Sequence, residues 1–487
     1  MSLSIRMTGS CESGPARPNV LHMRLPRRDS SQIASLVETG LWSPLSTRNL
    51  PMLRSRVLAC GLLLALSVGP CAGATPVAAE QRLQASIEAD QPHAVALLER
   101  LVNQNSGTLN LAGVKAAGNI VRAELEPLGF DVAWIDMRAT GRAGHLVATH
   151  TGNGRGKRIL LIGHLDTVFE PDSPFQRFVR NGDTATGPGI GDDKGGVVII
   201  VAALRAMHAA GTLRDADIKV VLTGDEESAG TPLEAARADL VAAGKWADVA
   251  LEYEGLIVDG GRDHATIARR GVADWELTAT GLTGHSSGVF GDALGYGANY
   301  ELARILDGFR RELPEPNLTL NIGLMVGGTP AALAPDGARG SAAGKTNIMA
   351  ERAAAVGDLR ALTPEQEART RARMQAIVAQ HLPKTGATLV FADAYPPMAP
   401  TAGNRALLAL LNQVNTDLGL PTMGEWDPAK RGAADSSFVA ADADVLAGMG
   451  AAGSRAHADG ETVDLASIPR QALRSAVLIG RLARTPR

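Results

Sequence analysis

Two stretches of the chain decide its fold: RILLIGHLD, residues 158–166, and GPGIGDDKGGVVIIVAALRAMHAAG, residues 187–211. The first is an apolar run of strand length that ends in a histidine and an aspartate. The second is a glycine-rich turn that opens a long helical pattern. Two further runs, IKVVLTGDEE at 218–227 and ADVALEYE at 247–254, follow with helical stretches between them. Strands that alternate with helices predict a mostly parallel sheet that is covered by helices on both faces.

The rhythm changes after Arg270, where a strand, a helix, two strands, a helix and a strand follow one another. This βαββαβ order predicts a small two-layer α+β domain, inserted over residues 271–393. Alternation resumes beyond residue 394 and ends in a helix that opens near Ser467-Ile468-Pro469. We therefore expect a main α/β domain in two parts, 75–270 and 394–487, interrupted by the inserted domain.

Residues 52–74 have the three-part form of a secretory signal: two arginines, an apolar run of about a dozen residues, and small residues ending at Ala74. The apolar run is short for a membrane span, which needs about 20 residues. Met52 stands where a signal peptide normally begins, so either Met1 or Met52 is the start. We expect residues 1–74 to be an N-terminal extension with a signal peptide, and the mature protein to be periplasmic or secreted without a stable membrane anchor.

Composition excludes several classes of function. The chain has 487 residues with 48 Lys and Arg against 51 Asp and Glu, and it has no long basic run, so nucleic acid is not an expected partner. Its three cysteines, Cys11, Cys60 and Cys71, all precede residue 75. The rest of the chain therefore holds neither a disulfide nor a thiol nucleophile.

Acids and histidines gather where the predicted strands end. The positions are His164, Asp166, the pair Asp192 and Asp193, the pair Glu226 and Glu227, Glu254, and His457 in a late loop. The carboxyl ends of parallel strands meet at one edge of a sheet, so these side chains are expected to lie together. So many uncompensated acids would repel one another in a partly desolvated cleft. A pair of divalent metals is the economical counter-charge, and imidazole with carboxylate suits zinc or a similar ion.

At this point the residues resemble the M20 metallopeptidases, particularly the glutamate carboxypeptidase branch. The likeness is carried, in order and in approximate spacing, by GHLDTV, GPGIGDDKGG, the DEE after a strand, YE about 27 residues later, and the late HADGETVD. It runs from about residue 85 to the end of the chain. In that family the inserted domain is a lid and dimerisation domain, so the resemblance implies a homodimer formed through this domain.

The resemblance also implies roles for individual residues. His164 and Glu254 would hold one zinc, Glu227 and His457 would hold the other, and Asp192 would bridge both. Asp166 would orient the imidazole of His164. Glu226 would be the general base that takes a proton from the metal-bridging water. Cobalt or manganese are possible substitutes for zinc.

Glu252 lies on the same face of its strand as Glu254, about 6.6 Å away at about 3.3 Å per residue, so the sequence alone allows either. We prefer Glu254 because it is nearer the rim. In the inserted domain, His285, Asn347 and Arg360 match family positions that stabilise the oxyanion and grip the substrate carboxylate. His285 is expected to act from the lid, across the dimer.

Two motifs point to other chemistry. Residues 284–288, GHSSG, satisfy the G-x-S-x-G pattern of serine hydrolases, but that turn belongs in a main sheet and here falls in the inserted domain. Residues 340–346, GSAAGKT, resemble a phosphate-binding loop but are one residue too short.

The sequence therefore predicts an exported di-zinc metallopeptidase, carboxypeptidase-like, that hydrolyses the amide bond next to a C-terminal amino acid of a small peptide. Two alternatives stay open. One is an aminoacylase or other N-acyl amino acid amidohydrolase, and the other is a non-catalytic metal- or peptide-binding protein of the same fold. FADAYPPMA, residues 391–399, stands where glutamate-specific relatives carry a substrate-binding arginine, so the side-chain preference is open.

Overall fold

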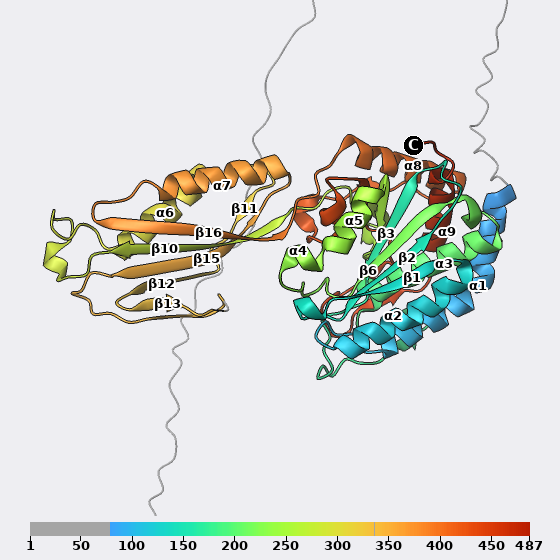
Figure 1. Cartoon of the computed structure of the whole chain (residues 1–487), viewed down its shortest axis with the longest axis horizontal. Helices are drawn as coiled ribbons and strands as arrows, with labels where there is room; N and C mark the ends of the chain where they lie inside the picture. Colours follow the sequence, from blue (N-terminus) through green and yellow to red (C-terminus); the bar gives the residue numbers. More distant parts are fainter. Residues whose placement is uncertain (1–77, 336) are drawn as a thin grey trace, which may run out of the picture. The chain divides into compact units, whose positions relative to one another are not determined.

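The computed structural model describes residues 78–335 and 337–487 (Figure 1). The expected signal peptide at about 52–74, with the rest of the N-terminal extension, lies outside these residues. Within the described ranges, no helix combines the length and the apolar character that crossing a bilayer requires.

The main domain is built on one six-stranded sheet in the order β1-β2-β6-β3-β7-β18. The four strands β6, β3, β7 and β18 are mutually parallel, whereas β1 and β2 form an antiparallel edge. The bounds are β1 (Asp131–Asp136), β2 (Gly144–His150), β3 (Arg158–His164), β6 (Asp217–Thr223), β7 (Val249–Glu252) and β18 (Asp444–Leu446). The prediction of an α/β fold with a largely parallel sheet is confirmed, and the antiparallel strands lie at its edge.

Helices cover both faces of this sheet, as expected from its buried strands. The helices are α1 (Ala78–Asn103), α2 (Leu111–Leu125), α3 (Gly195–Ala209), α4 (Leu233–Ala236), α5 (Ala238–Trp246), α8 (Ala402–Asp417) and α9 (Ser467–Leu482). Ile159 and Leu161 of β3 face the core formed with α1, α2, α3 and α9, whereas Leu160 and Ile162 face the core formed with α5. The twofold alternation of side chains along β3 therefore supplies both cores.

The inserted domain is a sheet with two helices on one face (Figure 1). Its elements are β10 (Val272–Gly281), α6 (Ala298–Glu312), β11 (Thr319–Leu320), β12 (Leu324–Gly328), β13 (Ala331–Leu333), β14 (Gly340–Ala342), β15 (Arg352–Arg360), α7 (Pro364–Val378) and β16 (Thr385–Tyr395). The strand order of the main sheet of this domain is β11-β15-β10-β16, and β12 also pairs with β15, whereas β13 and β14 pair only with each other. Trp275 and Leu277 of β10 form a separate core with α6 and α7.

Two small sheets of the main domain were not expected from the sequence. One contains β4 (Val179–Asn181), β5 (Thr184–Thr186), β19 (Gly453–Ser454) and β20 (Thr462–Asp464), and the other contains β8 (Ile257–Asp259), β9 (Arg262–Ala265) and β17 (Gly424–Glu425). Their strands are two to four residues long, so they carry too little periodicity to be recognised. The first sheet brings the late loop, which contains His457, beside the early turn, which contains Asp192.

Two predicted elements differ in detail. The helical stretch expected between IKVVLTGDEE and ADVALEYE is divided into α4 and α5 at Arg237, whose backbone has φ −110° and ψ 4°. The Arg237 side chain is buried between Asp225 and Asp435, and these ion pairs hold the residue out of the helical path. The strand predicted over ADVALEYE ends at Glu252, so Glu254 lies two residues beyond it.

Candidate metal centre

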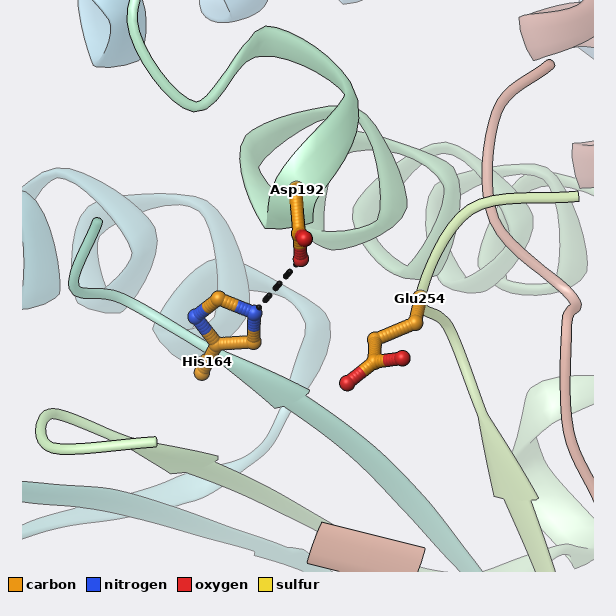
Figure 2. Close-up of side chains that lie close together, drawn as sticks. All are labelled: His164, Asp192 and Glu254. Carbon is orange, nitrogen blue, oxygen red and sulfur yellow. Dashed lines mark hydrogen bonds and ion pairs between the residues drawn. The ribbon is translucent and has the colours of Figure 1, made fainter. Parts of the chain in front are cut away.

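His164 is the last residue of β3 and is almost fully buried. One ring nitrogen, Nε2, lies 3.0 Å from Oδ1 of Asp192, and the other, Nδ1, lies 3.1 Å from the backbone oxygen of Asp166. The ring is thus held from both sides at the carboxyl edge of the parallel strands. Figure 2 shows the imidazole directed toward the carboxylates of Asp192 and Glu254.

Asp192 comes from the turn Ile190–Lys194 that precedes α3. Gly196, in the first turn of α3, is required by close packing, because a Cβ there would lie 2.0 Å from the backbone oxygen of Tyr253. The turn wraps around the buried carboxylate of Glu461, which accepts N–H bonds from Gly189, Gly191 and Asp192 at 2.8 to 3.0 Å. Glu461 therefore fixes the backbone that carries Asp192.

The structure brings all five predicted metal ligands together, in two groups that share Asp192. One group is His164, Asp192 and Glu254, and the other is Asp192, Glu227 and His457. In each group, the potential ligand atoms lie within 4.8 Å of one another. His457 Nε2 lies 3.2 Å from Asp192 Oδ2 and 3.0 Å from Glu227 Oε2. The arrangement has the geometry of two adjacent cation positions bridged by one carboxylate.

Glu254 and Glu252 have different surroundings. The Glu252 carboxylate is buried, is paired with Arg269 and accepts the backbone N–H of Ser436 at 3.2 Å. Glu254 is 2.7 Å from Arg269 and 3.3 Å from Arg431, yet it still belongs to the His164 group. The structure therefore places Glu254, not Glu252, within reach of a shared cation.

Asp166 lies under the site and is fully buried. It accepts a hydrogen bond from the Thr108 hydroxyl at 2.6 Å and from the backbone N–H groups of Glu226 and Glu227 at 3.0 and 3.1 Å. The same residue contacts His164 Nδ1. Asp166 thus couples the orientation of the histidine to the loop that carries both glutamates.

The electrostatics of the cluster are those of crowded acids. Burial, together with the charge of Glu254, raises the pKa of Glu226 well above its usual range, and burial raises the pKa of Glu254 to about 7. Hydrogen bonds to Asp192 and Glu227 raise the pKa of His457 to about 11. Asp192 is half-buried, and desolvation opposes its ionisation, but its bonds to His164 and His457 lower its pKa. Crowding of the acids thus favours the binding of positive charge at this site.

The donor set fits divalent metal. Oxygen Oε1 of Glu227 is buried and has no hydrogen-bond partner among the described residues, and the Glu227 carboxylate lies in one group with His457 and Asp192. Imidazole and carboxylate are the ligand types that zinc and related first-row ions prefer. An orphaned buried carboxylate oxygen in an acidic cluster costs free energy unless a cation binds it.

The three predicted residues of the inserted domain lie in a different environment. The Ser286 N–H donates to the Asn347 backbone oxygen at 2.9 Å, and His285 forms an isolated backbone β-bridge with Ile348. His285 and Asn347 are therefore neighbours. Arg360 ends β15 and is paired with Asp358 at 2.8 Å. Among the described residues, His285 belongs to neither group of potential ligands. The roles of all three residues stay predictions.

Several residues of the site were missed from the sequence. Glu461 is part of HADGETVD, but its three donors precede it by about 270 residues. Arg269 and Arg431 surround Glu254 with positive charge, and no spacing rule connects them to it. For Glu461, the sequence signal that could have found it is its position in the HADGETVD motif, four residues after His457.

Fold and site together define an α/β protein with a paired acid–histidine centre at the carboxyl edge of its parallel strands. The family model of "Peptidase family M20/M25/M40" matches residues 160–479, well over half of the chain. The chain belongs to this family, as its sequence motifs predicted.

Individual relatives are more distant. Carboxypeptidase G2 of Pseudomonas sp. (strain RS-16) is 33% identical over 201 residues, covering 40% of this chain and 46% of that one. Succinyl-diaminopimelate desuccinylase of Leptothrix cholodnii is 30% identical over 200 residues, covering 39% and 51%. The chain thus spans about half the length of the curated relatives it matches. The crystal structure of aminopeptidase PepT from Bacillus cereus superposes with a TM-score of 0.61 at 18% identity, covering 81% of this chain and 99% of that one, which shows a shared fold.

Proposed function

We propose that this protein is a two-metal hydrolase that cleaves the amide bond next to a free carboxylate, in the manner of a carboxypeptidase. Membership of the M20/M25/M40 family and the partial likeness to carboxypeptidase G2 support the class of reaction. The observation that carries the proposal is the sharing of Asp192 between two groups of potential ligands.

In this proposal, His164 and Glu254 hold one metal, Glu227 and His457 hold the second, and Asp192 bridges them. Zinc is the metal that we propose. When bound, such a pair acidifies a water molecule and polarises the scissile carbonyl. The chain holds the ligands in place through Asp166 and Glu461.

Glu226 is proposed as the general base. It stands beside a ligand, yet its side chain belongs to neither group, and no hydrogen bond occupies its carboxylate within the described residues. Its raised pKa suits a group that takes a proton and returns it to the leaving amine. A protein that only bound metal or peptide would have no use for a half-buried carboxylate without a bound partner here.

The inserted domain supplies the proposed substrate contacts. His285 would donate to the oxyanion, and Asn347 and Arg360 would hold the substrate carboxylate. Among the described residues, His285 belongs to neither metal group and Arg360 is paired with Asp358, so we propose that these contacts reach the metal centre from a partner subunit or by domain movement. We therefore also propose a homodimer through the inserted domain, and export of the mature chain to the periplasm or the exterior.

The test uses the mature chain, freed of metal with a chelator and then reloaded with zinc. We expect about two zinc ions per chain and hydrolysis of dipeptides that is lost on chelation. Amidation of the carboxylate next to the cleaved bond should lower kcat/KM strongly, because a guanidinium grips a carboxylate through paired hydrogen bonds. The variant Ser286→Ala, outside the proposed machinery, should keep its activity. Full hydrolysis by metal-free protein would refute the proposal.

A second candidate is an amidohydrolase of N-acyl amino acids. The observation that favours it is the partial likeness to succinyl-diaminopimelate desuccinylase. Both reactions use the same metal pair and the same base, so a panel of N-acyl amino acids beside dipeptides separates them by the ratio of kcat/KM values.

A further inference from the structure

Tyr395 is the last residue of β16, the strand through which the chain leaves the inserted domain. Its hydroxyl donates a hydrogen bond of 2.7 Å to the backbone oxygen of Glu226, which belongs to the main domain. The end of β16 is thus joined directly to the loop that carries the proposed general base.

Main-domain residues hold the Glu226 loop from other sides. The Glu226 N–H donates to Asp166 at 3.0 Å, and the preceding residue, Asp225, accepts from buried Arg237 at 2.6 Å and from the N–H of Gly230 at 2.8 Å. Among the described contacts of residues 225–227, the bond from Tyr395 is the one contributed by a strand of the inserted domain. The position of the Glu226 carbonyl therefore depends on the Tyr395 hydroxyl, which moves with β16.

The ring of Tyr395 is held in place on one side and has space on another. It packs on Phe438 with 5.2 Å between ring centroids, and the guanidinium of Arg237 lies 5.4 Å from the same Phe438 ring. Tyr395 also lines a cavity of about 890 Å³ whose walls include Val241 of α5 and Ala368 of α7. Because this volume is open, the tyrosine can follow a shift of β16 without displacing a close-packed core.

We propose that Tyr395 is a positioning residue that couples the inserted domain to Glu226. The hydrogen bond fixes the peptide after Glu226 and so restricts the direction of its carboxylate. A movement of the inserted domain that brings substrate contacts to the metal centre would act on the base through the same strand. The inference rests on the proposed function only in taking Glu226 as the base.

The test compares Tyr395→Phe with Phe438→Leu. The first variant removes the hydroxyl and keeps the ring, whereas the second removes the ring contact and keeps the hydroxyl. Tyr300→Phe, on the exposed side of α6, is the matched control for loss of a tyrosine hydroxyl. The measurements are kcat and KM of the zinc-loaded protein, metal content, and hydrogen–deuterium exchange of the amides in residues 225–230 of the metal-free protein.

For Tyr395→Phe, we expect kcat to fall about 2- to 12-fold, the range of one hydrogen bond, with KM and metal content near wild type. Exchange of the 225–230 amides should rise, and the Tyr300→Phe control should match wild type in both readouts. Unchanged kcat and exchange in Tyr395→Phe would overturn the inference. An equal loss of kcat in Phe438→Leu would also overturn it, because ring packing would then be the cause. A loss of metal in Tyr395→Phe would overturn it as well. The exchange measurement needs no turnover, so an inactive wild type would count against the proposed function and leave the coupling open to test.

Discussion

Replacing Glu461 by glutamine should weaken metal binding while leaving the chain folded. Oxygen Oε1 of Glu461 accepts the N–H groups of Gly191 and Asp192 at 2.8 and 3.0 Å, and Oε2 accepts the N–H of Gly189 at 3.0 Å. Glutamine retains one oxygen, which can serve the first pair. Its amide nitrogen then faces the Gly189 N–H, so one hydrogen bond is lost and two donors oppose each other.

The magnitude follows from these contacts. A hydrogen bond to a charged group contributes about 1.5 to 3 kcal/mol, and a buried N–H left without an acceptor costs a similar amount. We expect the variant to lose about 2 to 3 kcal/mol of stability in the turn that carries Asp192. Loss of residues that orient metal ligands typically lowers metal affinity about 10- to 100-fold. The two ranges agree, because a factor of ten corresponds to about 1.4 kcal/mol.

The assay is a zinc titration of metal-free protein against a competing chelator, with Tm of the metal-free protein as a second readout. It should be run at pH 8, because burial raises the pKa of Glu461 to about 7 and the carboxylate is ionised above that value. Asp459→Asn is the matched control, since it removes the same charge from an exposed position of the same loop. Wild-type affinity in Glu461→Gln would refute the reasoning. An equal loss in both variants would assign the effect to charge alone.

Three further predictions concern the base, the inserted domain and its stability. Glu226→Gln should keep both metals and lose about 10²- to 10⁴-fold in kcat, whereas Glu227→Gln should lose metal; metal analysis showing the reverse would exchange their roles. His285→Ala should bind metal normally and lose about 10²- to 10³-fold in kcat, with partial recovery on mixing with Glu226→Gln subunits if the contact crosses a dimer; no recovery from a verified mixed dimer would place the contact within one chain. Glu301 is buried, but its bond to Arg304 lowers its pKa below 4.5, so its stabilisation is present above pH 4.5 and is lost as the pH falls through the lowered pKa. Glu301→Gln should therefore lower stability by about 2 kcal/mol at pH 7 and approach wild type in acid; a pH-independent difference in Tm would contradict this.

The sequence by itself determined the architecture and the region of the site. Buried parallel strands are apolar runs, and the helices between them have a different period, so RILLIGHLD and its neighbours could be recognised locally. Parallel strands meet at one edge, so residues that follow β3, β6 and β7 had to be close. The family motifs then assigned a role to each of them, and the structure places the five predicted ligands in two groups around Asp192.

Tertiary structure alone decided the contacts that depend on side chains distant in sequence. Glu252 and Glu254 are equivalent by strand periodicity, and Arg269 is paired with both, but Glu252 also accepts the N–H of Ser436, and only Glu254 belongs to the His164 group. Glu461 acquires its role because β20 lies next to β5 and brings a late loop against an early turn. Hydrogen bonds and ion pairs of this kind act over about 3 Å in space, whatever the separation along the chain, and so leave no periodic signal in the sequence.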